Sequence, residues 1–225
     1  MKDLETRLHY TFRDRSLLEH ALTHSSYANE HRQGPAGSNE RLEFLGDSVL
    51  GMVTADYLYR THADLPEGEL TRIRAALVCE NSLHKVAEEL ELGRYLKLGK
   101  GEDSGGGRER PSILADAVEA ILAAVYLDGG IGSARKIIAH FILDREGEEV
   151  DAGRDYKTAL QEIVQRENGQ VLAYRLLREE GPDHAKLFTV AVDLNGTMVG
   201  EGSGRSKKLA EQAAAKAAIA TLNQD

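Results

Sequence analysis

The chain contains the stretch Asn39-Glu40-Arg41-Leu42-Glu43-Phe44-Leu45-Gly46-Asp47-Ser48-Val49-Leu50, which decides how its N-terminal part folds. Read as a helix, it places Glu40, Glu43 and Asp47 on one face, at i, i+3 and i+7. The opposite face is expected to carry apolar residues: Leu42, Leu45, Val49, Met52 and Val53. Because like charges at these spacings cost roughly a few tenths of a kcal/mol per pair, we expect a cation to be held against them. Carboxylate oxygens suit Mg²⁺ or Mn²⁺.

A second acidic pair lies in another apolar segment. Asp116 and Glu119 are three residues apart within Ile113–Ile121, so they share a helix face. The small residues Ala120 and Ala123 beside them would let another helix approach closely. Two such helices could meet and form a cage of four carboxylates. The alternative reading, a solvated helix face, is common for acids at this spacing and stays open on these residues alone.

The composition limits the cellular setting. The chain has 225 residues, of which 41% are hydrophobic, so it can bury a core of one or two domains. It contains no long apolar run, so we expect no membrane association, and its first residues lack the order of a secretion signal. Cys79 is the only cysteine, which favours the reducing cytoplasm. Because it lies in an apolar run, Cys79 is expected to be buried.

The net charge of −9 is distributed unevenly. Residues 1–150 carry 18 Lys and Arg against 26 Asp and Glu, whereas residues 151–225 carry 10 against 11. An acidic total argues against a nucleic-acid partner, because polyanion binding is driven by basic residues. That objection weakens if basic residues cluster locally and divalent ions neutralise the acids.

The apolar spacing predicts two domains: an all-α domain over residues 1–146 and an α+β domain over residues 155–225, joined by a charged linker at 147–154. No strand is expected before residue 150. The helices expected in the first domain are Leu4–Leu8, Ser16–Ala28, Glu40–Arg60, Gly68–Leu90 and Ile113–Tyr126. Glycine, proline and polar clusters separate them, including Gly99–Pro111.

The second domain is predicted to follow the order α-β-β-β-α. The expected elements are a helix at Tyr156–Glu167, strands at Leu172–Arg178, Lys186–Leu194 and Thr197–Gly202, and a helix at Ser206–Leu222. Asn195-Gly196 is a strong hairpin signal, and Ser206 is a suitable N-cap.

The stretch Glu40–Ser48 closely resembles the signature of the bacterial ribonuclease III family. Three further matches follow the family's order: Ala21–Tyr27, Glu67–Ala75 and the Asp116–Glu119 segment. The resemblance implies a Mg²⁺-dependent endonuclease of double-stranded RNA, in which Mn²⁺ can substitute. Matched by position, the metal ligands would be Glu43, Asp47, Asp116 and Glu119, with Asp47 and Glu119 catalytic. Glu40 and Glu67 match two supporting acids.

The resemblance also implies products and an assembly. Metal-assisted hydrolysis would leave 5′-phosphate and 3′-hydroxyl ends with a short 3′ overhang, in the processing of ribosomal, messenger and other precursor RNAs. The family is dimeric, and Phe44 matches an aromatic residue that inserts into the partner. A solitary exposed aromatic is the alternative reading of Phe44.

Residues 155–223 resemble a double-stranded-RNA-binding domain. The resemblance rests on Lys157–Glu162, Gly181–His184 and Gly200–Glu211. It implies that Lys207 and Lys208, at a helix N-terminus, meet phosphates, and that the first helix and the loop meet minor grooves. The implied contacts are Thr158, Gln161, Glu162 and Gln165 on the helix, with Pro182 and His184 on the loop.

Two other functions compete with this interpretation. One is a regulator that binds duplex RNA without cutting it, which intact acids at all six family positions disfavour. The other is a carboxylate-bridged redox metalloprotein, which would lack histidine ligands and leave residues 155–223 unexplained. His20 and His24 have a zinc-like i, i+4 spacing, but no Glu follows His20 as the metalloprotease motif requires.

Overall fold

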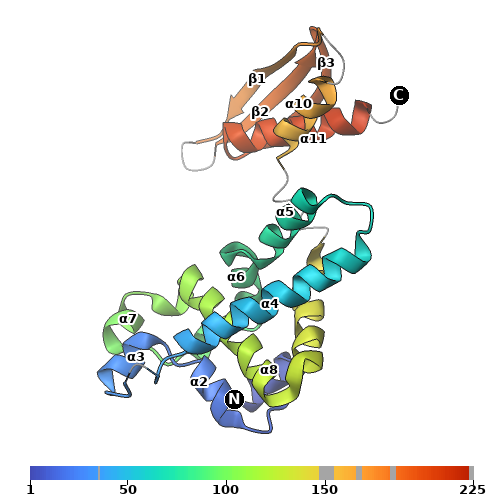
Figure 1. The fold of residues 1–225 in the computed structure, drawn as a ribbon. Helices are drawn as coiled ribbons and strands as arrows, with labels where there is room; N and C mark the ends of the chain where they lie inside the picture. The colour runs from blue at the N-terminus through green and yellow to red at the C-terminus, as the bar shows by residue number, and fades with distance from the viewer. Residues whose placement is uncertain (35, 147–154, 166–168, 183–185, 223–225) are drawn as a thin grey trace. The chain divides into compact units, whose positions relative to one another are not determined.

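The computed structural model describes residues 1–34, 36–146, 155–165, 169–182 and 186–222. They form two compact units, Met1–Gly153 and Arg154–Asp225 (Figure 1). The predicted linker at 147–154 lies outside the described residues, so its bounds stay a prediction. None of the helices in the described ranges has the length and apolar composition needed to cross a bilayer.

The first unit is helical, as predicted, and its described residues contain only an isolated bridge between Thr23 and Lys97 in place of a strand. Its α-helices are α1 (Lys2–Arg7), α2 (Arg15–Ala21), α3 (Ser25–Glu30), α4 (Glu40–Thr61), α5 (Glu67–Val78), α6 (Glu80–Glu89), α7 (Lys100–Ser104) and α8 (Pro111–Phe141). Short 3₁₀ turns are η1 (Leu92–Arg94), η2 (Gly107–Glu109) and η3 (Leu143–Arg145).

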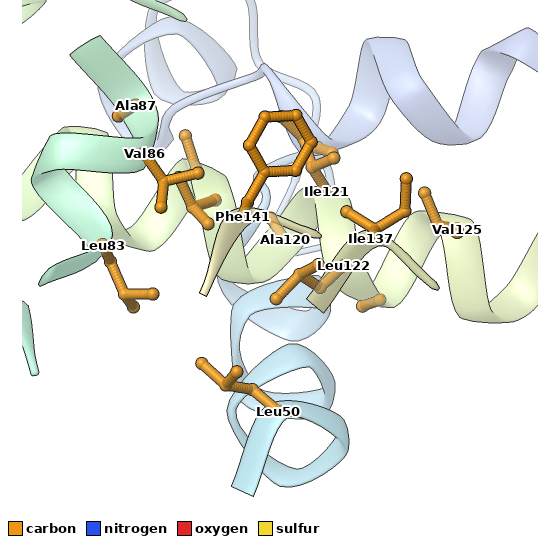
Figure 2. Packing of buried hydrophobic residues seen from close by; sticks show 14 of the residues in the cluster. Leu50, Leu83, Val86, Ala87, Ala120, Ile121, Leu122, Val125, Ile137 and Phe141 are labelled. Atoms are coloured by element: carbon orange, nitrogen blue, oxygen red, sulfur yellow. The ribbon is translucent and has the colours of Figure 1, made fainter. Parts of the chain in front are cut away.

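Helix α8 is the centre of this unit. Pro111 begins it, at the position where a missing N–H costs nothing. Every residue from Ala120 to Val125 is buried, so the helix is covered on all sides. Gly130 breaks the helical geometry with φ 75° and ψ 177°, which bends the chain into two arms. Figure 2 shows side chains of both arms packing with α4 and α6 into one core, with Phe141 of the second arm beside Val86.

Helix α4 confirms the expected element at Glu40–Arg60, with one residue wrongly assigned. Leu42, Val49 and Val53 are buried as predicted, and Leu45 is half-buried, but Met52 is 53% exposed. Because a helix turns about 100° per residue, Met52 lies at the margin of the buried face, on the side of Phe44.

Two expected helices are each divided in two. Ser16–Ala28 is interrupted at Leu22–His24, because Leu22 and His24 exchange backbone hydrogen bonds with Lys97 instead of continuing the helix. Gly68–Leu90 is interrupted at Cys79, whose ψ of 159° is extended. Cys79 is exposed, so its predicted burial was wrong. The apolar period hid this break, since Leu77 and Leu83 on either side of it both face the core.

The separator expected at Gly99–Pro111 contains α7 and η2. The Arg108 guanidinium organises it by donating to the carbonyl oxygens of Gly93 and Leu96, at 2.8 and 3.0 Å. Arg108 thus ties this segment to the residues around η1.

The second unit has the predicted order α-β-β-β-α. Its elements are α10 (Tyr156–Gln165), β1 (Leu172–Glu180), β2 (Leu187–Leu194), β3 (Thr197–Gly204) and α11 (Lys207–Leu222). The strands form an antiparallel sheet in the order β1-β2-β3, with both helices on one face (Figure 1). Asn195 and Gly196 have φ of 52° and 83°, which is the predicted hairpin geometry. The Ser206 hydroxyl accepts from the backbone N–H of Leu209 and so caps α11, also as predicted.

Glycine decides how closely α11 approaches β3. A Cβ built on Gly202 would lie 2.2 Å from the backbone nitrogen of Ala214. Ala214 and Ala218 are fully buried at this contact. Small residues on both elements therefore bring the helix backbone directly onto the strand.

Candidate active site and RNA-binding surface

Helices α4 and α8 cross at Gly46 and Glu119. A Cβ built on Gly46 would lie 1.9 Å from the carbonyl oxygen of Glu119. This distance is too short for any side chain, so only glycine fits here. The close approach predicted for the alanines of α8 is thus made by a glycine of α4, between Glu43 and Asp47. This contact brings the acidic face of α4 beside the acidic face of α8.

The pKa values show that the four acids interact. Burial is the largest cause that raises the pKa of Glu119 to about 7, and the charges of Asp47, Glu43 and Asp116 contribute to the same rise. The pKa of Glu43 is also raised, first by burial and then by Asp116, Glu40 and Asp47. Burial is the largest cause of the raised pKa of Asp116. Four carboxylates contributed by two helices therefore share one electrostatic environment.

This group is partly open to solvent. Glu43, Asp116 and Glu119 are half-buried, whereas Asp47 is exposed. Among the residues that the structure describes, no three acidic, histidine or cysteine side chains converge closely enough to hold a metal ion as they stand. The group is thus a set of interacting charges whose side chains would have to turn inward to share an ion.

The two supporting acids lie in different places. Glu40 is exposed at the start of α4, where its carboxylate accepts from the Ser38 hydroxyl at 3.0 Å, and it contributes to the raised pKa of Glu43. Glu67 begins α5 and accepts from the Thr71 hydroxyl at 2.8 Å. Glu67 is not among the charges that shift the pKa values of Glu43, Asp116 and Glu119.

Two neighbours of Asp116 were not assigned to the site from the sequence. Glu80, the first residue of α6, raises the pKa of Asp116, and His24 lowers it. His24 lies in the Ala21–Tyr27 motif, so the sequence carried a signal for it. No sequence pattern predicts that Glu80 lies near Asp116, because it is the break at Cys79 that places the start of α6 there.

Helix α4 also carries an exposed apolar strip. Phe44 is 78% exposed, and Met52 and Tyr59 of the same helix are 53% and 76% exposed. Their spacing places them on one side of the helix. We call these three residues the α4 strip. Of the three, only Phe44 was predicted from the sequence to lie at an interface.

In the second unit, the residues expected to contact RNA are exposed where the structure describes them. They are Thr158, Gln161, Glu162 and Gln165 on α10, Pro182 after β1, and Lys207 and Lys208 at the start of α11. His184 lies outside the described residues. The starts of the two helices are joined by Asp155, whose carboxylate accepts from the backbone N–H of Thr158 at 3.1 Å and from the Gln212 amide at 2.9 Å. The Lys207 ammonium lies 5.8 Å from the centre of the Phe188 ring.

Comparison with known proteins shows which family this chain resembles. Residues 14–146 match the Ribonuclease-III-like family, and residues 156–222 match the double-stranded RNA binding motif. A Ribonuclease 3 of Pelotomaculum thermopropionicum is 53% identical and covers 96% of this chain and 90% of that protein. The chain belongs to the ribonuclease III family. A Ribonuclease 3 of Oceanobacillus iheyensis is 49% identical, with 99% and 98% coverage.

A solved structure agrees with the first unit. The nuclease domain of ribonuclease III from Campylobacter jejuni has 44% identity and a TM-score of 0.59, and covers 64% of this chain and 96% of that chain. That structure is described as showing flexibility in a region involved in dimer formation. Membership of the ribonuclease III family confirms the predicted class, an endoribonuclease for double-stranded RNA with a metal-dependent activity.

Proposed function

We propose that Glu43, Asp47, Asp116 and Glu119 hold Mg²⁺, or Mn²⁺ in its place, for hydrolysis of a phosphodiester bond in duplex RNA. The observation that carries this proposal is the close α4–α8 crossing at Gly46 and Glu119, which brings the four carboxylates together. The raised pKa of Glu119 is the expected consequence of this arrangement. Gathering four like charges costs free energy that a divalent cation offsets, and the oxygen donors suit Mg²⁺. The donor chemistry therefore fits the ion, once the side chains turn toward it.

The residues divide the chemical work. When bound, the cation supplies an activated water and polarises a phosphoryl oxygen. Asp47 and Glu119 act as the catalytic pair: Asp47 is exposed to arriving RNA, while Glu119 is half-buried at the crossing. Glu40 and Glu67 act as supporting acids. Cleavage of the bond between phosphorus and the 3′-oxygen leaves a 5′-phosphate and a 3′-hydroxyl.

The second unit binds the RNA through basic and polar side chains, because the acidic nuclease domain is poorly suited to hold it. Lys207 and Lys208 face phosphates from the start of α11, and Thr158, Gln161, Glu162 and Gln165 meet a minor groove. Pro182 and His184 complete the contact from the loop. We infer that the substrates are ribosomal, messenger and other precursor RNAs in the cytoplasm.

We also infer a homodimer with the α4 strip at its interface. Phe44 is the anchor, because a large aromatic ring with 78% of its surface exposed is typical of an interface centre. Two symmetric sites, each cutting one strand, would leave a short 3′ overhang.

Cleavage of a labelled duplex RNA tests the proposed function. We expect cutting with Mg²⁺ or Mn²⁺, none with EDTA, and none by Glu119→Ala in the presence of Mg²⁺. The control is single-stranded RNA of the same sequence. Binding of the duplex without any cutting would favour the regulator, and products with 2′,3′-cyclic phosphate ends would contradict hydrolysis by a metal-activated water.

A further inference from the structure

Asn39 begins α4 without capping it through its side chain. Asparagine is preferred at N-caps because its side chain accepts from a backbone N–H of the first turn. Asn39 is the N-cap of α4, but its side chain makes no such hydrogen bond. Only its backbone carbonyl serves the helix, accepting from the backbone N–H groups of Leu42 and Glu43 at 2.8 and 2.9 Å. Because Asn39 is only 3% exposed, its amide needs a partner elsewhere in the protein.

The Asn39 amide ties the start of α4 to the end of α2. Its Nδ2 donates to the backbone carbonyl oxygen of Ala21 at 3.2 Å, and the backbone N–H of Asn39 donates to the carbonyl oxygen of Thr23 at 2.8 Å. The last carbonyl groups of a helix have no partner within that helix, and α2 ends at Ala21. Asn39 therefore satisfies polar groups at the end of one helix while it begins another.

Ser38 strengthens this connection, and it is as deeply buried as Asn39. Its backbone carbonyl oxygen lies 2.8 Å from Nε2 of His20, in the last turn of α2. Since a carbonyl oxygen can only accept, this ring nitrogen donates. The Ser38 hydroxyl in turn donates to the Glu40 carboxylate at 3.0 Å. We call Ser38 and Asn39 the α4 anchor.

The anchored turn carries two acids of the candidate active site, Glu40 and Glu43. One turn further along, Gly46 lies against the backbone of Glu119 in α8. Helix α4 is thus held by α2 at its start and by α8 at the crossing, and Glu43 lies between these two contacts. A first turn held at the crossing alone could rotate or slide, which would change the direction of the Glu43 carboxylate.

We propose that Ser38 and Asn39 are positioning residues for the metal site: they hold the first turn of α4 on α2, so that the Glu43 carboxylate is directed toward the cation. This inference rests on the metal site of the proposed function. Neither residue of the α4 anchor has to touch the cation or the RNA. Groups that hold metal ligands in place are worth roughly 10- to 100-fold in metal affinity.

Two substitutions test the α4 anchor from opposite sides. Asn39→Ser keeps a residue that is as good an N-cap as asparagine, so α4 can still begin, but it removes the amide that donates to Ala21. His20→Leu acts from α2, because it removes the donor to the Ser38 carbonyl and changes no residue of α4 or of the α4 anchor. If Asn39→Ser does not fold, His20→Leu decides the test.

Tyr10→Phe is the matched control. It removes another tertiary hydrogen bond of the first unit, from the Tyr10 hydroxyl to the Asp128 carboxylate at 2.7 Å. Asp128 lies more than two helical turns beyond Glu119, so this bond touches none of the four acids. We expect Tyr10→Phe and both anchor variants to melt below wild type, and thermal unfolding sets a temperature at which all of them are folded.

Binding of Mn²⁺ alone to the full chain, without RNA, is then measured at that temperature, with free Mn²⁺ followed by electron paramagnetic resonance. We expect Asn39→Ser to weaken Mn²⁺ binding by roughly 10-fold, the lower end of the range for groups that hold ligands in place. His20→Leu should weaken it in the same direction. Tyr10→Phe should bind Mn²⁺ as wild type does.

Other results would overturn the inference. Wild-type Mn²⁺ affinity in either folded anchor variant would show that the α4 anchor serves the fold alone. A loss of affinity in Tyr10→Phe equal to that in Asn39→Ser would show that lowered stability, and not a misplaced Glu43, weakens the site. A wild-type chain that binds no Mn²⁺ would instead overturn the proposed metal site, and the role of the α4 anchor with it.

Discussion

Gly46 of α4 lies against the backbone carbonyl of Glu119 of α8, so closely that an added Cβ would be 1.9 Å from the carbonyl oxygen. Neither helix backbone can be displaced without moving the acids on both sides of the contact. The geometry of the candidate active site is therefore set by a residue that has no side chain.

We predict that Gly46→Ala lowers both stability and RNA cleavage. Overpacking of this kind costs about 1–3 kcal/mol, and separation of the helices would move Glu43 and Asp47 away from Asp116 and Glu119. Urea unfolding and duplex cleavage measure the two effects. Gly132→Ala is the matched control, since Gly132 of α8 has no atom within 4 Å of an added Cβ. Equal behaviour of the two variants would show that the crossing tolerates a methyl group.

Glu119 gives the metal-free protein a pH-dependent stability. Its pKa in the folded chain is about 7, above its ordinary value of 4.5. A raised carboxyl pKa means that its contribution to stability is complete below pH 4.5 and is lost as pH rises through 7. In EDTA, we predict that wild type loses stability relative to Glu119→Gln between pH 4.5 and pH 7 and stays less stable above it.

Thermal unfolding of both proteins across this range is the measurement. The difference between them isolates Glu119 from the other titrating groups. Saturating Mg²⁺ should remove the wild-type deficit at pH 8. Parallel curves for the two proteins in EDTA would mean that the pKa of Glu119 is not raised in the folded chain.

Much of this arrangement could be predicted from sequence, and the exceptions have physical causes. The acids and the helices that carry them follow from spacing, because Glu43, Asp47, Asp116 and Glu119 lie in long periodic segments. The breaks at His24 and Cys79 could not be predicted, because the apolar period continues across them and tertiary hydrogen bonds to Lys97 decide the first. Met52 was assigned to the wrong face because its exposure depends on which helices pack beside α4. Glu80 was missed because only the break at Cys79 brings the start of α6 near Asp116.

Asp155 joins the two helices of the RNA-binding unit. The Gln212 amide, followed by the backbone and hydroxyl of Thr158, lowers its pKa to about 2. A lowered carboxyl pKa stabilises the fold above its ordinary value of 3.8, and this contribution is lost as pH falls toward 2. We predict that Asp155→Ala destabilises this unit by about 1 kcal/mol, the usual worth of an N-cap.

Chemical unfolding of the full chain at pH 7, followed by signals of the second unit, checks this value. Asp155→Asn keeps both acceptor contacts and should retain most of the stability while losing its dependence on acid pH. An Asp155→Ala variant as stable as wild type would contradict the capping role.

Phe44→Ala is predicted to weaken the homodimer, because it removes the anchor of the α4 strip. Sedimentation velocity over a dilution series measures the change, and Tyr59→Ala should act in the same direction. Leu127→Ala is the control, since Leu127 is an exposed apolar residue of α8 outside the strip. An unchanged monomer–dimer equilibrium in Phe44→Ala would mean that its exposed ring has no interface role.

Replacing Lys207 and Lys208 together by alanine should weaken duplex binding and flatten its dependence on salt. Each lysine that neutralises a phosphate contributes roughly one unit to the slope of log affinity against log salt. The measurement is duplex affinity between low and physiological salt for an uncleavable complex in Ca²⁺ or EDTA. Lys136→Ala, at an exposed position of α8, is the control. An unchanged slope would remove both lysines from the RNA contact.

The central claim is that carboxylates from α4 and α8 converge on one divalent cation. A crystal of the full chain soaked in Mn²⁺ and measured for anomalous scattering tests it directly. We predict a strong peak at the α4–α8 crossing, bound by oxygens of Glu43, Asp47, Asp116 and Glu119. A map without a peak among these four side chains at saturating Mn²⁺ would contradict the account.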